Sequence, residues 1–171
     1  MSKRIVVHPE NCTGCRLCEL ACSFEKSGAF SAAYSRIKVA AFDESASFIP
    51  LLCTQCDGAW CFKICPIAAV VRDPESKVFR IDNEHCVGCR MCIMACPFGS
   101  ATYDAEHGKA IKCDECGGSP RCVSVCPNVA LTYEGEAAGP LSKRIKVANQ
   151  LLATANKDNL RAGSGNVKTA K

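Results

Sequence analysis

The chemistry of this 171-residue chain lies in its sixteen cysteines, which stand in four groups of four with none left over. Cysteine at about 9% of a short chain is typical of bound metal or of a disulfide scaffold. His8, His85 and His107 are scattered, so the sequence offers no catalytic constellation. The four groups are Cys12, Cys15, Cys18 and Cys22; Cys53, Cys56, Cys61 and Cys65; Cys86, Cys89, Cys92 and Cys96; and Cys113, Cys116, Cys122 and Cys126.

The spacing within the groups favours iron–sulfur clusters. A cubane [4Fe-4S] cluster needs one thiolate at each of four irons, and a compact loop can deliver three while the fourth comes from elsewhere. The third group reads C-x2-C-x2-C-x3-C-P, the bacterial ferredoxin pattern whose last cysteine ligates the other cluster. The first group differs by Ser23 in place of that proline, and the second and fourth groups lengthen the middle spacing to four and five residues. Four such groups predict four [4Fe-4S] clusters.

Zinc, disulfides and radical chemistry are the alternatives. Zinc also takes four thiolates, but its C-x2-C pairs are separated by a longer spacer than the two to five residues found here. Disulfides need an oxidising compartment, and residues 1–10 contain no apolar signal segment. A radical enzyme would normally leave one iron without a cysteine, whereas here four cysteines are available for each of four sites.

Charge and hydropathy exclude other classes of function. The formal net charge is +4, but sixteen thiolates and four oxidised cubane cores of +2 each would turn it to −4. The basic composition therefore does not indicate nucleic-acid binding, and no basic tract is interleaved with the eleven aromatic residues. No run of about eighteen apolar residues could span a bilayer. We expect a soluble, cytoplasmic protein, unless a partner that carries a signal exports it.

Two copies of one unit hold the cysteines. The first and third groups match at an offset of 74 residues, as NCTGCRLCELAC against HCVGCRMCIMAC, and the second and fourth groups both end in Cys-Pro and a short apolar run. Short strands are predicted around the groups, at residues 5–7, 70–71, 78–81 and 130–133. The last two cysteines of the first and third groups lie four residues apart, which predicts a short helix at each.

Two segments lie outside this repeat. Residues 23–52 are an insertion with a possible strand at 34–42, and the sequence does not indicate their function. From residue 141 a helix-like apolar stripe runs beside basic residues, through Leu141, Ile145, Ala148, Leu152 and Ala155. We expect this helix to contact another subunit, with further copies of the same chain as candidates, and a helix packed on its own domain stays open as the alternative.

The motifs together resemble the four-cluster ferredoxin-like subunits of molybdenum and tungsten pterin oxidoreductases, typified by the electron-transfer subunit of dimethyl sulfoxide reductase. The resemblance covers about residues 4–134, and within the family the chain is most similar to the small iron–sulfur subunit of bacterial tungsten-containing aldehyde oxidoreductase. It implies an α+β fold in which one bacterial-ferredoxin-like module is inserted in another. The outer module would comprise residues 1–52 and 110–140, the inner module residues 53–109, and a C-terminal helix and flexible tail residues 141–171.

The resemblance also implies which cysteines share a cluster. In the family the first group pairs with the fourth and the second with the third, and the last cysteine of each group crosses to the other cluster of its pair. The four implied ligand sets are Cys12, Cys15, Cys18 and Cys126; Cys22, Cys113, Cys116 and Cys122; Cys53, Cys56, Cys61 and Cys96; and Cys65, Cys86, Cys89 and Cys92.

The function implied by the resemblance is electron transfer, with no catalytic site in this chain. It would relay electrons between a large tungsto- or molybdopterin catalytic subunit, with aldehyde oxidoreductase as the expected activity, and a flavin-containing NAD-linked subunit or another acceptor. A free-standing soluble polyferredoxin and a zinc-binding structural module remain the alternatives.

Overall fold

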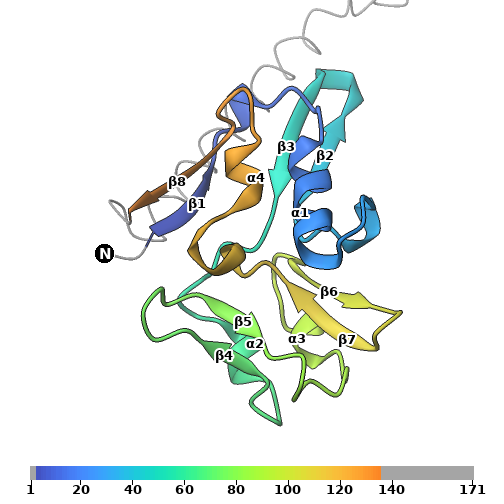
Figure 1. The fold of residues 1–171 in the computed structure, drawn as a ribbon, viewed down its shortest axis with the longest axis vertical. Helices are drawn as coiled ribbons and strands as arrows, with labels where there is room; N and C mark the ends of the chain where they lie inside the picture. Colours follow the sequence, from blue (N-terminus) through green and yellow to red (C-terminus); the bar gives the residue numbers. More distant parts are fainter. Residues whose placement is uncertain (1–2, 136–171) are drawn as a thin grey trace, which may run out of the picture. The chain divides into compact units, whose positions relative to one another are not determined.

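The computed structural model describes residues 3–135, which form antiparallel strand pairs and short helices, an α+β arrangement (Figure 1). The predicted helix from residue 141 and the tail lie outside the described residues. The strands are β1 (Lys3–Val7), β2 (Lys38–Phe42), β3 (Ser47–Leu51), β4 (Val70–Arg72), β5 (Phe79–Ile81), β6 (Ala101–Asp104), β7 (Lys109–Lys112) and β8 (Leu131–Gly135). The helices are α1 (Leu17–Ser27), α2 (Trp60–Lys63), α3 (Met91–Met94) and α4 (Arg121–Ser124). None of these helices is both long and apolar enough to cross a bilayer.

The strands form four two-stranded sheets. β1 pairs with β8, so the two ends of the described chain lie side by side, with Ile5 opposite Tyr133. The other three sheets, β2–β3, β4–β5 and β6–β7, are each made of strands that follow one another in the chain. The strands predicted near residues 5–7, 70–71, 78–81 and 130–133 are confirmed as β1, β4, β5 and β8. β3, β6 and β7 were not predicted.

Ser23 explains why α1 is long and α3 is short. Both helices begin one residue before the third cysteine of their group, where short helices were predicted. α3 ends at Met94, just before the turn that Pro97 imposes after Cys96. The first group has Ser23 at that position, and α1 continues to Ser27. The Ser23 side chain is fully buried; its hydroxyl donates to the Leu20 carbonyl oxygen at 2.9 Å. The missing proline therefore leads the helix directly into the insertion.

The insertion of residues 23–52 folds mainly as the β2–β3 hairpin. β2 occupies the second half of the strand expected at 34–42, and a 3-10 turn, Ala32–Tyr34, precedes it. The Glu19 carboxylate on α1 accepts a hydrogen bond from the Val39 backbone N–H at 2.6 Å and so ties the hairpin to the helix. Ile37, 1% exposed, anchors the same hairpin in the core.

Cysteine side chains make up much of both hydrophobic cores. One core combines Cys18, Cys22, Ile37, Val39, Cys122 and Leu131, and the other combines Ala59, Ala69, Val70, Phe79, Cys86, Cys92 and Ala110. In Figure 1, α1 and α4 accompany the β1–β8 and β2–β3 sheets, whereas α2 and α3 accompany β4 to β7. Few large apolar side chains are buried in either core, so packing alone gives so small a protein little stability.

Candidate metal centres

Three hollows in the described part of the chain are each lined by four cysteines. Each hollow is partly open to solvent. Apolar side chains contribute to their walls, among them Leu131 in the first, Ile37 in the second and Val70 in the third. The thiols are those of Cys12, Cys15, Cys18 and Cys126; of Cys22, Cys113, Cys116 and Cys122; and of Cys65, Cys86, Cys89 and Cys92. We call these the first, second and fourth sites.

The remaining four cysteines, Cys53, Cys56, Cys61 and Cys96, are called the third site. Burial raises the pKa of the Cys53 thiol, and the charges of Cys56 and Cys96 raise it further. Burial likewise raises the pKa of Cys61, and the charges of Cys53 and Cys56 raise it further. Electrostatic contacts therefore link these four thiols to one another, and the last of them comes from a different sequence group.

Each site draws three cysteines from one group and one from its partner group. The first and second sites combine the first and fourth groups, whereas the third and fourth sites combine the second and third groups. β1–β8 pairing brings the first and fourth groups together, and the local β4–β5 pairing does so for the second and third. No three Cys, His, Asp or Glu side chains within residues 3–135 converge as they would on a single metal ion. Four thiols at each hollow are the donor set that a multi-iron cluster requires.

Backbone N–H groups point at several of these sulfur atoms. In the three Cys-Pro turns, the residue four positions later donates to the cysteine Sγ: Ala69 to Cys65 at 3.3 Å, Ser100 to Cys96 at 3.4 Å, and Ala130 to Cys126 at 3.2 Å. Cys22 lacks the proline turn and instead accepts from the N–H of Arg36, in the insertion, at 3.3 Å. Such N–H donors favour the thiolate over the thiol, and the thiolate is the form that ligates iron.

Burial in the hollows works against thiolates when no positive charge is present. It raises the pKa of Cys18 to about 11 and that of Cys122 to about 12, and it moves Cys113 in the same direction. Neighbouring thiols add to the effect, since like charges disfavour ionisation. Bound iron would supply the compensating positive charge, so ligation would release protons and become tighter as pH rises.

Electrostatic interactions connect thiols of different sites. The charge of Cys18 in the first site contributes to the raised pKa of Cys122 in the second. Cys53 in the third site acts in the same way on Cys113 in the second, and Cys61 in the third acts on Cys92 in the fourth. Thiols of the first and second, second and third, and third and fourth sites are therefore electrostatic neighbours.

An ion-pair network stands at the second site. The Asp114 carboxylate pairs with Lys26 Nζ at 2.8 Å and with an Arg36 guanidinium nitrogen at 3.2 Å. Burial alone would raise the pKa of Asp114, but the hydrogen bond from Lys26 and the charges of Lys26 and Arg36 together lower it. Both cations line the hollow of the second site, so the network joins α1 and the insertion to the fourth cysteine group.

Replacement of Asp114 by asparagine should destabilise the holo-protein by ~1–3 kcal/mol, because Lys26 and Arg36 lose their carboxylate. The folded pKa of Asp114 is lowered from 3.8, so its stabilisation is fully present at pH 7 and is lost only as pH falls through that lowered value. Anaerobic urea titration, followed by the iron–sulfur absorbance, measures the effect.

Glu25→Gln is the matched control for Asp114→Asn. This change removes the 3.0 Å ion pair between Glu25 and Arg121, whose side chains are 36% exposed for Glu25 and 58% exposed for Arg121. Because the pair is exposed, its loss should cost about 1 kcal/mol or less. Equal urea midpoints for the two variants would contradict the structural role assigned to Asp114.

The three histidines contact polar side chains, and for His8 one of these is the Thr132 hydroxyl at 3.1 Å. His85 Nδ1 contacts Asp82 at 2.9 Å and His107 Nδ1 contacts Asp104 at 2.7 Å, in exposed turns. Sequence reasoning missed three buried polar residues near the sites, Gln55, Lys112 and Glu115. The repeat offered one signal, because Gln55 and Glu115 both stand directly before the second cysteine of their groups.

Comparison with known proteins identifies two matching family models. One, described as a 4Fe-4S dicluster domain, matches residues 45–136, and the other, described as a 4Fe-4S binding domain, matches residues 9–25. Together they reach all four cysteine groups.

Individual relatives carry related descriptions. A probable anaerobic dimethyl sulfoxide reductase chain, YnfG of Escherichia coli (strain K12), is 34% identical, with the match covering 63% of this chain and 58% of that protein. The polyferredoxin-like subunit of aliphatic sulfonate oxidoreductase from Pyrococcus furiosus is 36% identical over 64% of this chain and 63% of its own length. The chain therefore spans less than two thirds of these curated relatives.

Among solved structures, a chain of the active-site complex BamBC of benzoyl coenzyme A reductase with zinc aligns with 93% of this chain and 97% of its own length. The identity is 21% and the TM-score 0.47, too low for this likeness to carry an argument.

Proposed function

The chain belongs to the family of 4Fe-4S dicluster proteins, whose model spans more than half of its residues, and on that premise we propose an iron–sulfur electron-transfer subunit of an oxidoreductase complex. It has no catalytic site of its own and holds four [4Fe-4S] clusters. The observation that carries this proposal is the grouping of four thiols around each of three hollows, with the remaining four cysteines as electrostatic neighbours.

The ligands of each cluster are the four cysteines of one site. The clusters, when bound, supply one-electron oxidation and reduction. The chain's own residues provide the thiolates, donate N–H groups to sulfur, and surround the sites with apolar side chains such as Val39 and Ala110. These amide donors, together with burial and local charge, set the potential of each site.

The outer module comprises residues 1–52 and 110–140, and the inner module residues 53–109. The β1–β8 sheet supports this nesting, because it joins the first cysteine group to the fourth across the whole inner module. The inner module has its own β4–β5 sheet, and it supplies all the buried residues of the core around Cys86 and Cys92 except Ala110.

Four sites in series make a relay between two surfaces of the protein. One end delivers electrons to, or takes them from, a large tungsto- or molybdopterin catalytic subunit, for which aldehyde oxidation is our candidate activity. The other end exchanges electrons with a flavin-containing NAD-linked subunit or another acceptor. The relatives named as a dimethyl sulfoxide reductase chain and as an oxidoreductase subunit support a catalytic partner. The word polyferredoxin in the second name keeps a free-standing polyferredoxin as the alternative.

Anaerobic purification from the native host tests the proposal. We expect a brown protein with about sixteen irons and as much acid-labile sulfide per chain. A co-purifying large subunit with tungsten or molybdenum supports the complex, and a lone monomer with full iron supports the free polyferredoxin. A colourless protein that contains zinc and no sulfide would overturn both.

The crossing of ligands between groups predicts a specific pattern among serine variants. Cys126 stands in the fourth group but lines the first site with Cys15, whereas Cys122, four residues earlier, lines the second. Cys126→Ser should therefore perturb the same EPR signal as Cys15→Ser, and a different one from Cys122→Ser. Each variant should lose or convert one cluster of four. If Cys126→Ser and Cys122→Ser perturbed the same signal, the crossed assignment would be wrong.

A further inference from the structure

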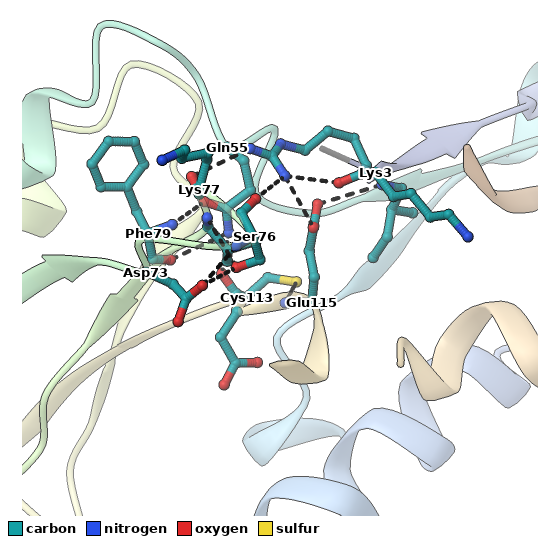
Figure 2. A network of polar contacts seen from close by, with 12 residues as sticks. Lys3, Gln55, Asp73, Ser76, Lys77, Phe79, Cys113 and Glu115 are labelled. Atoms are coloured by element: carbon teal, nitrogen blue, oxygen red, sulfur yellow. Dashed lines mark hydrogen bonds and ion pairs between the residues drawn. The ribbon is translucent and has the colours of Figure 1, made fainter. Parts of the chain in front are cut away.

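The loops that carry Cys53 and Cys113 meet in a buried polar network. Figure 2 shows Gln55, Phe79, Cys113 and Glu115 in this network. The Gln55 amide donates to the Cys113 carbonyl oxygen at 2.8 Å and to the Phe79 carbonyl oxygen at 3.3 Å. Since Cys53 belongs to the third site and Cys113 to the second, this network lies at the step between these two sites.

Gln55 and Glu115 occupy equivalent places in the two copies of the repeat. Each precedes the second cysteine of its group, and both have left-handed backbones, with φ of 48° and 52°. Gln55 Oε1 accepts from the Phe79 N–H on β5 at 2.8 Å, and Glu115 Oε1 accepts from the Ile5 N–H on β1 at 3.4 Å. Phe79 and Ile5 themselves differ by the same 74-residue offset as the first and third cysteine groups.

The two copies differ in charge. Next to Glu115 lies Arg4, with a guanidinium nitrogen 3.7 Å from the carboxylate. Next to Gln55 lies Lys112, with Nζ 3.5 Å from the amide oxygen. The first pair is neutral as a whole, whereas the second keeps the full positive charge of the ammonium group.

Lys112 has only neutral oxygens as hydrogen-bond acceptors. Its side chain is buried, at 3% exposure, and Nζ donates to the Cys113 carbonyl oxygen at 3.0 Å and to the Phe79 carbonyl oxygen. Arg4 and Lys112 are the two buried cations of residues 3–135, and within that range Lys112 forms no ion pair with a carboxylate. At the position of the repeat equivalent to Lys112 stands Leu52, which lines the second site. The copies therefore differ by one buried positive charge.

This charge lies beside the loop that carries the third-site cysteines. Lys112 Nζ is 3.5 Å from the side-chain oxygen of Gln55, which directly precedes Cys56 in that loop. A cation stabilises whichever state of a neighbouring group is more negative, and the effect is strong where water is excluded. A ligated cluster becomes more negative by one charge when it accepts an electron, and local charge is one of the factors that set its potential.

We propose that Lys112 is a positioning residue of the relay that raises the reduction potential of the third site through a buried charge that Gln55 leaves uncompensated. The inference rests on the proposed function, because it requires a cluster on Cys53, Cys56, Cys61 and Cys96. It makes the middle of the series, rather than either end, the place where one residue tunes the energy of the transferred electron.

Redox titration of the anaerobic full-length protein, followed by EPR, tests this inference with two variants. Lys112→Met removes the charge, and Gln55→Glu compensates it with a carboxylate that the repeat already accommodates at Glu115. In both we expect the midpoint potential of one cluster to fall, changing its oxidised-to-reduced ratio at fixed potential at least tenfold, or ~59 mV for one electron. Lys38→Met, which removes an exposed lysine, is the control. The midpoint potentials of the other three clusters should shift no more in Lys112→Met and Gln55→Glu than they do in this control.

The affected signal should be the one that Cys56→Ser perturbs, and Lys112→Arg should restore the wild-type potential. Unchanged potentials in Lys112→Met and Gln55→Glu with full iron would overturn the inference. So would loss of a quarter of the iron from both, since that result would assign Lys112 and Gln55 to holding the loops together. Failure of the proposed function is separate, because it would appear as missing clusters in the wild-type protein.

Discussion

Removal of iron from the anaerobic protein should unfold it, with loss of most of its far-ultraviolet circular dichroism. The cores depend on cysteine side chains: three of the six buried residues in the core around Ile37 and Leu131 are cysteines. α2, α3 and α4 have four residues each, far too short to persist without tertiary contacts. All four sheets have two strands, and isolated two-stranded hairpins are at best marginally stable in water.

Electrostatics point in the same direction. Without iron, the buried thiols are held protonated, as the pKa of about 12 for Cys122 indicates. Neutral thiols around open hollows provide no cross-links, whereas four ligated clusters would join the first group to the fourth and the second to the third. Metal-binding free energy is then folding free energy, as in other small metal-dependent domains.

The experiment is chelation under reducing, anaerobic conditions, followed by circular dichroism and then by addition of ferrous iron and sulfide. We expect the spectrum to collapse and to recover on reconstitution. The recovery is the control that distinguishes reversible unfolding from damage to the chain. A native-like spectrum in protein with no remaining iron would contradict the prediction.

Substitution of Gly88 by alanine should have the second largest effect, a loss of more than ~3 kcal/mol or failure to assemble the fourth site. Gly88 lies between Cys86 and Cys89, both ligands in our proposal, and has a φ of +69°. A Cβ at this position would stand 2.0 Å from the carbonyl oxygen of Gly108. That oxygen belongs to the backbone between β6 and β7, so no side-chain rotation can relieve the overlap.

Two other glycines provide graded controls. Gly99 also has a positive φ, +60°, but its Cβ would meet nothing within 4 Å, so Gly99→Ala should cost only the ~1–2 kcal/mol of the left-handed backbone. A Cβ on Gly14, the equivalent of Gly88 in the first group, would meet the Phe48 ring at 2.6 Å, and a side chain can move.

The anaerobic urea midpoint should therefore be highest for Gly99→Ala, lower for Gly14→Ala and lowest for Gly88→Ala. The iron content of Gly88→Ala should be reduced by about a quarter. A Gly88→Ala variant with full iron and the midpoint of Gly99→Ala would show that the β6–β7 turn does not cover the fourth site as described.

The comparison of Gly14 with Gly88 shows how far the sequence could predict the fold. The repeat aligns Gly14 with Gly88 and the first cysteine loop with the third, and short apolar runs located β1, β4, β5 and β8. It did not reveal that the β2–β3 hairpin lies over the first loop as the β6–β7 turn lies over the third. These coverings come from segments of unequal length and different sequence, so no repeated motif marks them.

The sequence by itself determined the chemistry of the protein, because ligand type and spacing within a loop are local properties: the cysteine groups, their pairing into a repeat and the family resemblance can be read without coordinates. Only the tertiary structure decided the polar environment of the sites. Gln55, Lys112 and Glu115 are unremarkable in the sequence, and their burial beside thiols results from contacts between residues far apart in the chain. The effect of a charge depends on its distance from sulfur and on the exclusion of water, and both arise only when the two copies of the repeat pack together.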